Sequence, residues 1–348
     1  MNRVAVIRDP LCLKHSNGPG HPESRQRLEA IEGMLASFPA RDRLEPLQAR
    51  DARFEELAWV HTPEYIRSIE STRGRPFTVL DPDTGAGPES CAAALRAAGG
   101  VLQAVDAVLE GGRSGAFALI RPPGHHAEAD RAMGFCLFNN AAVAACYALR
   151  RHGLHRVLIV DWDVHHGNGT MHAFYDRPEV LYFSIHQYPH YPGTGRVEEV
   201  GRGPGAGYTI NVPLPGGQGD ADYLAAFRQL LLPVAREYAP QLILVSAGFD
   251  GHQDDPLADM RVSTGGFADL TGVLRGLAAE CCPGRLALAL EGGYQLKALA
   301  EGVAAVLTRL LDEQPESGIG QSGPPDAATS RVIAAVRETL APYWAWRE

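Results

Sequence analysis

Lysine is almost absent from this sequence. Only Lys14 and Lys297 occur among the 32 basic residues, and the formal net charge of the 348-residue chain is −9. Proteins that bind nucleic acids neutralise phosphates with clustered Lys and Arg side chains, and this sequence contains no such basic stripe. The composition therefore argues against a nucleic-acid partner. The modest acidity is typical of a soluble protein and only weakly favours cationic partners.

Paired cysteines and membrane-length apolar runs are also missing. No CxxC pair and no disulfide-framework spacing occurs, so we expect reduced thiols at Cys12, Cys91, Cys136, Cys146, Cys281 and Cys282. No apolar run approaches the ~18 residues of a membrane span, and the N-terminus shows neither a basic region nor a cleavage site. We therefore expect a cytoplasmic protein with no membrane contact. The preference for Arg over Lys, with much Ala, Gly and Pro, is typical of a GC-rich bacterial gene.

Short apolar runs alternate with helical patterns along the chain. Most runs lack polar alternation, as parallel strands covered on both faces do. Candidate strands occupy residues 4–8, 116–120, 157–160, 180–185, 208–212, 242–246 and 286–290, and candidate helices occupy residues 22–35, 88–109, 140–151, 220–238, 264–280 and 296–311. This order predicts an α/β protein with a mostly parallel sheet between helices. No linker divides it, so we expect a single domain over residues 1–348, with a flexible loop at 313–327 and a last helix at 328–341.

Polar clusters follow five of the candidate strands. They occupy residues 121–126, 161–168, 184–186, 247–250 and 291–294. In open α/β sheets, ligands bind outside the carboxyl ends of the strands, where the loops converge. Five clusters at one edge therefore predict a functional site there.

Metal-competent side chains alternate directly after the strand at 157–160. Side chains two apart in an extended segment share a face, so Asp161, Asp163 and His165 can point the same way. Buried carboxylates are costly without a partner, and a divalent cation would satisfy them. With Asp250, the pair Asp163 and His165 forms an oxygen, nitrogen, oxygen set that leaves coordination positions free, as in catalytic sites. Zinc is the first choice, with iron(II) or manganese as alternatives. For Asp163 and His165 alone, a strand-end hydrogen-bond cluster is the competing interpretation.

Two adjacent histidines, His125 and His126, follow a Pro-Pro-Gly turn that is suited to fixing loop geometry. A lone histidine in such a loop is usually structural, but two beside a metal site favour catalysis. A neutral imidazole can take a proton from water and return it to a leaving amine. Asp161 and Asn168 are available to orient the rings.

Three aromatic residues lie in loops near these groups. Tyr294, in a Gly-Gly-Tyr turn, could donate its hydroxyl to a developing oxyanion. Phe135 and Tyr191 could wall a narrow apolar channel. Taken alone, each aromatic residue is explained at least as well by packing. Together, a metal, an imidazole base and a phenol describe hydrolysis of an unactivated amide.

In combination, these motifs resemble the histone deacetylase superfamily, which includes bacterial deacetylase-like amidohydrolases, acetylpolyamine amidohydrolases and acetoin-utilisation proteins. The similarity extends from the HSNGPGHPE segment at residues 15–23 to EGGY at residues 291–294, about four-fifths of the chain. Its other motifs are RPPGHHA, GFCLFNN, VDWDVHHGNGT, YPGTG and SAGFD. The resemblance implies the arginase/deacetylase fold, a central parallel sheet of about eight strands with helices on both faces.

The resemblance also implies a role for each matching residue. Zinc would be bound by Asp163, His165 and Asp250. His126, paired with Asn168, would act as general base and then acid, while His125, paired with Asp161, would support it electrostatically. Tyr294 would be the oxyanion donor. The tunnel for an acyl-lysine side chain would be lined by Phe135, Gly134 and Tyr191. Members often hold a monovalent cation near this site, which implies structural potassium bound through Asp161, Asp163, His165, Ser184 and Ile185.

Finer features of the motifs point to a substrate class. With Asn168 after His-His-Gly and Glu291 before Gly-Gly-Tyr, the sequence resembles the class II branch of the superfamily. Leu257 stands where acetylpolyamine-specific members can place a glutamate, which favours an acyl-lysine chain, although the loop also carries Asp254, Asp255 and Asp259. We also expect the loop at 15–23 beside the site entrance and Asp83 on its rim, where the carboxylate could accept substrate backbone N–H groups.

The leading hypothesis is a zinc-dependent deacylase of lysine side chains that acts on acetyl or longer acyl groups. The first alternative is an amidohydrolase of acetylated polyamines or another small acetylated amine. The second is a non-catalytic acyl-lysine binding protein. The oligomeric state and the role of the last helix are left open.

Overall fold

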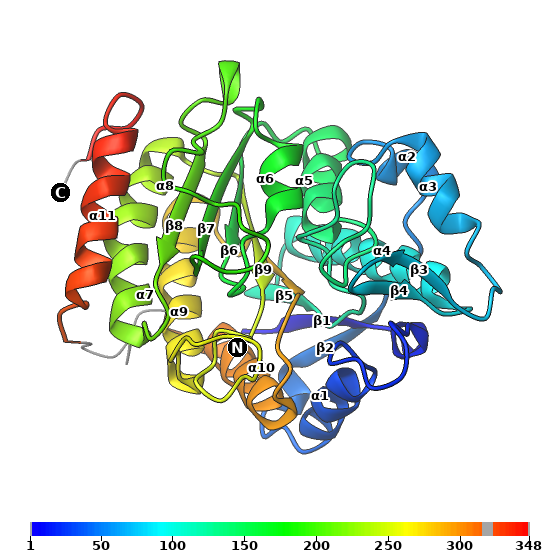
Figure 1. Ribbon diagram of the computed structural model, residues 1–348. Coiled ribbons are helices and arrows are strands. Elements are labelled where there is room, and N and C mark those ends of the chain that lie inside the picture. Colours follow the sequence, from blue (N-terminus) through cyan, green and yellow to red (C-terminus); the bar gives the residue numbers. More distant parts are fainter. Residues whose placement is uncertain (1, 315–322, 347–348) are drawn as a thin grey trace.

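The computed structural model describes residues 2–314 and 323–346. Its centre is an eight-stranded sheet with the order β2-β1-β5-β10-β9-β6-β7-β8, in which all neighbouring strands run parallel (Figure 1). The predicted α/β class and parallel sheet are confirmed. The strands are β1 (Val4–Arg8), β2 (Leu44–Gln48), β5 (Gly115–Ala118), β6 (Val157–Asp161), β7 (Val180–Gln187), β8 (Thr209–Leu214), β9 (Leu242–Ala247) and β10 (Leu286–Leu290).

Seven of these strands overlap the candidate strands, whereas β2 is missing from the sequence prediction. Its sequence, Leu-Glu-Pro-Leu-Gln, contains two polar residues and a central proline. The strand lies at one edge of the sheet, where a proline is tolerated because one side of the backbone pairs with no neighbour. The sequence also gives no sign of the small antiparallel sheet formed by β3 (Thr78–Asp81) and β4 (Thr84–Ala86).

Helices cover both faces of the sheet (Figure 1). On one face, α4 packs against β1, β5 and β10, and α5 packs against β6 and β9; on the other, α9 and α10 pack together and α1 packs on α10. The helices are α1 (Gln26–Ala36), α2 (Phe54–Leu57), α3 (Pro63–Glu70), α4 (Ser90–Leu109), α5 (Asn140–Arg151), α6 (Asn168–Ala173), α7 (Asp220–Ala226), α8 (Leu232–Tyr238), α9 (Thr264–Cys281), α10 (Leu296–Leu311) and α11 (Ala327–Leu340).

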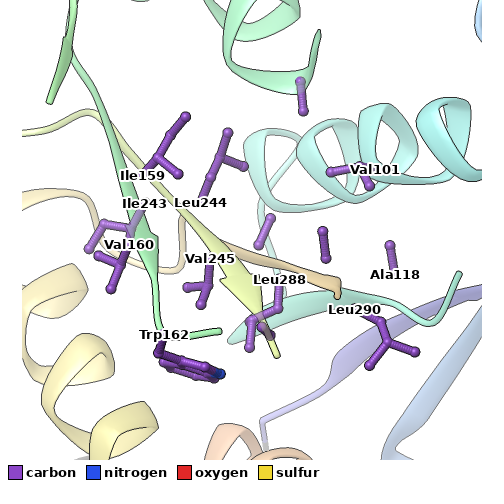
Figure 2. Packing of buried hydrophobic residues seen from close by; sticks show 14 of the residues in the cluster. Val101, Ala118, Ile159, Val160, Trp162, Ile243, Leu244, Val245, Leu288 and Leu290 are labelled. Atoms are coloured by element: carbon purple, nitrogen blue, oxygen red, sulfur yellow. The ribbon is translucent and has the colours of Figure 1, made fainter. Parts of the chain in front are cut away.

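The central strands are buried on both sides. Figure 2 shows Ile159 and Leu244 pointing toward the side of α4, while Val160 and Val245 point to the opposite side. These residues are paired in register between β6 and β9, and each is at most 2% exposed. Because helices cover both faces, apolar side chains on either side of such a strand are buried. This explains why the strands appear in the sequence as unbroken apolar runs.

The predicted helix at 220–238 contains a wider central turn. A π-helical segment, Phe227–Leu231, joins α7 to α8. Pro233 has no N–H to donate to the carbonyl of Gln229 four residues earlier. Arg337 of α11 donates to that carbonyl instead, at 3.2 Å and 3.4 Å.

Helix α4 has the length and apolar composition of a membrane-spanning helix, which corrects the expectation that no segment approaches one. In the structure, 67% of the residues in an 18-residue apolar stretch of this helix are buried. Its Arg96 side chain is 2.7 Å from Asp51 and also bonds Asp9. Packing of α4 against three strands and α5 accounts for its apolar composition.

The last predicted helix is present as α11 and lies one residue earlier at each end than expected. It packs against β8, with Ile333, Val336 and Leu340 buried. Beyond it, Trp344 donates its Nε1–H to the carbonyl of Gly207 at 2.7 Å. The helix therefore covers the core. The predicted loop at 313–327 falls mostly on residues 315–322, which lie outside the described residues, and the single-domain expectation stays a prediction.

Candidate active site

The polar clusters expected at the strand ends converge in the middle of the sheet. The strands β5, β10, β9 and β6 are consecutive neighbours in the sheet. Along the chain β6 is the next strand after β5, so β10 and β9 lie between two strands that are successive in the sequence. The loops after them carry His125 and His126, Tyr294, Asp250, and the pair Asp163 and His165. Since parallel strands end at a common edge, these four loops meet above it.

Three buried donors form a compact cluster at this edge. Nδ1 of His165 lies 3.2 Å from Oδ1 of Asp163 and 3.2 Å from Oδ2 of Asp250. One donor atom of each residue lies within 4.8 Å of the others. Backbone N–H groups hold both carboxylates in place, from Val164 to Asp250 at 3.0 Å and from Gly292 to Asp163 at 2.8 Å. Two oxygens and one nitrogen in this arrangement fit a divalent cation with open coordination positions.

The charges of the cluster also fit a cation. Burial raises the pKa of Asp250, and the adjacent Asp163 carboxylate raises it further. Burial by itself would lower the pKa of His165, but hydrogen bonds to Asp163 and Asp250 raise it to about 10. In the metal-free protein, a proton on His165 therefore offsets one of the two carboxylate charges. A metal ion would replace that proton, because a ligating imidazole must be neutral.

His125 and His126 lie side by side, with ring centroids 4.0 Å apart, but their pKa values shift in opposite directions. Burial disfavours the charged form of His125, yet Asp163 and Asp161 raise its pKa well above the usual value. Burial lowers the pKa of His126 well below the usual value, and the charges of His125 and His165 lower it further. His125 is thus the cationic member and His126 the neutral member of the pair.

Hydrogen bonds define the protonation of both rings. Nδ1 of His125 lies 3.0 Å from Oδ2 of Asp161, and Nδ1 of His126 lies 2.8 Å from Oδ1 of Asn168. An amide oxygen only accepts, so Nδ1 of His126 carries the proton and Nε2 keeps its lone pair. A general base requires this state. The structure brings together both pairs that the sequence analysis names.

Contacts from distant parts of the chain hold Tyr294. Burial raises the pKa of its phenol well above the usual value, so the hydroxyl keeps its proton. The guanidinium of Arg27 lies 5.1 Å from the centre of its ring and donates to the carbonyls of Glu291 and, at 2.6 Å, Gly293. The Asp255 carboxylate accepts the N–H of Tyr294 at 2.6 Å. The sequence prediction includes neither of these supports for Tyr294, because an arginine in a surface helix and an aspartate in a loop are usually solvated.

The loop at 15–23 is tied to the same turn. Glu23 accepts hydrogen bonds from Arg27, at 3.1 Å, and from Arg121, and none of the three side chains is exposed. His21 packs edge-on against Phe135, with ring centroids 4.5 Å apart. The loop therefore lies beside the entrance, as expected.

A cavity of about 260 Å³ leads to these groups. The residues lining it include all five predicted substrate contacts, Asp83, Gly134, Phe135, Tyr191 and Leu257, together with His125, His126, His165 and Tyr294. His190 also lines the cavity without having been predicted; its ring stacks on His165 at 5.1 Å, and its Nε2 lies 3.1 Å from the Leu257 carbonyl oxygen. Oδ1 of Asp83 already accepts the N–H of Gly134 at 3.1 Å, so its binding of substrate backbone stays a prediction.

A family model described as the histone deacetylase domain matches residues 21–310. This chain belongs to the histone deacetylase family. Histone deacetylase 15 of Arabidopsis thaliana is 41% identical over 352 residues, and human polyamine deacetylase HDAC10 is 43% identical over 334 residues. These alignments cover 98% and 92% of this chain but only 62% and 49% of the two relatives. A probable deacetylase of Archaeoglobus fulgidus is 42% identical over 291 residues, or 82% of this chain and 79% of that protein.

The fold of this chain also matches a solved structure from the histone deacetylase family. The crystal structure of the HDA15 HD domain matches with a TM-score of 0.91 at 39% identity, covering 99% of this chain and 95% of that one. The expected arginase/deacetylase fold is thereby confirmed. These relatives come from a plant, human and an archaeon, so the bacterial origin of this chain stays a prediction. Its cytoplasmic location stays a prediction as well.

The residues expected to hold a monovalent cation in this histone deacetylase chain lie on adjoining strands. Asp161 at the end of β6 pairs in register with Ser184 of β7, and Ile185 follows it. Oγ of Ser184 lies 2.9 Å from Nδ1 of His186. Potassium at this position stays a prediction.

Gly292 makes the tightest backbone approach to the donor cluster. A Cβ at this position would lie 1.9 Å from Oδ2 of Asp250 and 2.7 Å from Oδ2 of Asp163. We expect Gly292→Ala to displace both carboxylates and weaken zinc binding by about 100-fold or more, measured by competition with a chromophoric chelator. Gly33→Ala is the matched control, since a Cβ there meets nothing within 4 Å. Unchanged zinc affinity in Gly292→Ala would contradict the assignment of the donors.

Proposed function

We propose that this protein is a zinc-dependent hydrolase that removes acetyl, or longer acyl, groups from lysine side-chain amides. One observation carries the proposal: a neutral histidine base and a protonated phenol line the same cavity as His165 of the three-donor cluster. Zinc held by Asp163, His165 and Asp250 would supply a Lewis acid that polarises the scissile carbonyl and makes water more acidic.

The chain's own residues would carry the proton transfers. Nε2 of His126 accepts a proton from the attacking water and then delivers it to the leaving amine. The hydroxyl of Tyr294 donates to the oxygen of the substrate carbonyl as negative charge develops there. His125, whose Nδ1 lies 3.0 Å from Oδ2 of Asp161, would support His126 electrostatically from beside it.

The shape and polarity of the cavity support an acyl-lysine substrate. Phe135, Tyr191 and Leu257 line it with apolar surface, which suits the four methylene groups of a lysine side chain. A free polyamine would carry a second ammonium group past Leu257 and find no carboxylate at that position. The proposed partner is therefore an acylated lysine of a protein or peptide.

A small acetylated amine is the second candidate. It is favoured by the 43% identity to human polyamine deacetylase HDAC10 and by Asp83 at the cavity. Asp81 lies close to Asp83, and burial and that neighbour raise the pKa of Asp81. Two acids near the entrance could attract an ammonium group.

A comparison of two substrates tests the proposal. We expect the zinc-loaded protein to hydrolyse an acetyl-lysine peptide with a kcat/KM at least about tenfold above that for acetylspermidine. Chelation should abolish turnover, and added zinc should restore it. Binding of the peptide without turnover would instead support a non-catalytic acyl-lysine binding protein.

Leu257 sets this preference in the proposed site. We expect Leu257→Glu to lower kcat/KM for the peptide and raise it for acetylspermidine, changing their ratio by about tenfold or more through a carboxylate that pairs with the second ammonium. Leu257→Met is the apolar control and should keep the original order. An unaltered ratio in Leu257→Glu would remove Leu257 as the gatekeeper.

A further inference from the structure

The carboxylate of Glu128 lies behind the histidine base, His126, and outside the substrate cavity. The side chain of Glu128 is 8% exposed, and its Oε1 accepts an N–H of the Asn168 amide at 2.5 Å. Its two oxygens also lie 2.9 Å and 3.0 Å from Nδ1 of His172 in α6. His126, Asn168, Glu128 and His172 thus form a continuous chain of hydrogen bonds from the cavity to the protein surface.

The orientation of the Asn168 amide decides the tautomer of His126. An amide presents an accepting oxygen on one side and a donating NH₂ on the other. Oδ1 of Asn168 faces Nδ1–H of His126, so Nδ2 must face acceptors. It meets Oε1 of Glu128, the carbonyl oxygen of His126 at 3.3 Å and Sδ of Met133 at 3.4 Å.

Of these acceptors, Glu128 alone is charged. Hydrogen bonds to an ionised acceptor are roughly twice as strong as neutral ones. A flipped amide would set its oxygen against the carboxylate and its NH₂ against Nδ1 of His126. That arrangement would stabilise the tautomer with the proton on Nε2, which cannot accept a proton from water.

The surroundings keep Glu128 ionised. Burial would raise its pKa, but hydrogen bonds from His172 and Asn168 outweigh burial and lower it. The hydrogen bond with Glu128 in turn raises the pKa of His172. Nη2 of Arg131 lies 3.8 Å from Oε1 of the same carboxylate and adds a further positive charge.

We propose that Glu128 is a positioning residue for the histidine base: by fixing the amide of Asn168, it keeps Nε2 of His126 free of its proton and directed at the substrate. The inference rests on the proposed deacylase function, in which His126 is the base. Glu128 acts through Asn168 and does not touch the substrate.

The first test replaces the carboxylate by an amide of the same size. Glu128→Gln can turn either its oxygen or its NH₂ toward Asn168, so the preference for one amide orientation is lost. We expect kcat for an acetyl-lysine peptide to fall about tenfold or more, with KM unchanged within about twofold. In ¹⁵N-histidine-labelled protein, the His126 ring signals should change from one Nδ1-protonated form to a mixture of tautomers.

Glu56→Gln is the matched control. Glu56 is also a buried glutamate, but it bonds Arg50 at 2.8 Å and lies in another part of the chain. We expect it to alter neither kcat nor the His126 tautomer. A single, unchanged Nδ1-protonated form of His126 in Glu128→Gln would overturn the proposal.

The second test predicts a reversal of sign. Asn168→Asp would place another carboxylate at hydrogen-bond distance from Glu128, where like charges repel. In that background, Glu128→Gln removes the repulsion, and the NH₂ of the new glutamine can donate a hydrogen bond to the carboxylate introduced at position 168. Glu128→Gln should therefore lower kcat in the unchanged chain and raise it in the Asn168→Asp chain. A decrease in both backgrounds would overturn the proposal. The tautomer measurement needs no turnover, so failure of the deacylase proposal would be recognised separately.

Discussion

Replacement of Tyr294 by phenylalanine should lower kcat for an acetyl-lysine peptide by about 10²-fold or more, with KM changed by no more than about threefold. The hydroxyl contributes mainly when negative charge develops on the substrate oxygen, so its loss affects the transition state more than binding. The ring keeps its packing against Phe135, at 5.9 Å, and Arg27. Steady-state kinetics of the zinc-loaded variant measure both constants.

Tyr208→Phe serves as the control for this substitution. Tyr208 packs against Trp344 at 5.4 Å beside the last helix, away from the loops that build the site. It should retain the full kcat. Turnover that Tyr294→Phe leaves unaltered would rule out the phenol as oxyanion donor.

Asp250→Asn should have the second large effect, the loss of zinc and with it of turnover. The amide can still accept the N–H of Val164 through Oδ1, so the loop keeps its hydrogen bond, but one of two anionic ligands is gone. We expect zinc affinity to fall by about 100-fold or more and turnover at limiting zinc to fall in parallel. Competition with a chelator and metal analysis of the purified variant measure the first quantity.

The same substitution should have the opposite effect on the metal-free fold. A carboxyl group whose pKa is raised on folding destabilises the protein once the pH exceeds the pKa that the group has in the unfolded chain, because the unfolded state then releases a proton that the buried group holds more tightly. Without metal, Asp250→Asn should therefore melt at or above the temperature of the unchanged chain at pH 7. Zinc should raise the melting temperature of the unchanged chain and scarcely that of the variant. A metal-free variant that melts well below the unchanged chain would argue against mutual repulsion of Asp163 and Asp250.

The local pattern of apolar and polar residues explains which parts of the fold can be predicted from the sequence. The strands covered on both faces, such as β6 and β9, each begin with four apolar residues and lead into polar loops, so their positions are evident. β2 is half-buried, contains Pro46 and is stabilised mainly by its pairing with β1, a contact between residues about forty positions apart. Its identity as a strand depends on that tertiary contact and leaves little trace in its own composition.

The same distinction applies to the site. Asp161, Asp163 and His165 are recognisable because they alternate within one strand end, and Asp250 because it follows another. Arg27 and Asp255, which support Tyr294, lie in separate segments and appear as ordinary surface charges until the chain is folded. Glu128 follows the two histidines closely, yet its importance depends on which way the Asn168 amide faces. Orientation of that kind has no counterpart in residue spacing.

The packing of α11 against β8 affects more than the stability of that corner. A terminal strand with a free row of N–H and C=O groups invites another chain to add to the sheet. Here β8 is flanked by α11, and Trp344 takes up the carbonyl of Gly207 just before that strand. At the far margin, β2 carries Glu45 and Pro46, a charge and a residue without an N–H, both of which oppose strand addition. Addition of a further strand is therefore opposed differently at the two edges of the sheet: by the packing of α11 at β8, and by Glu45 and Pro46 at β2.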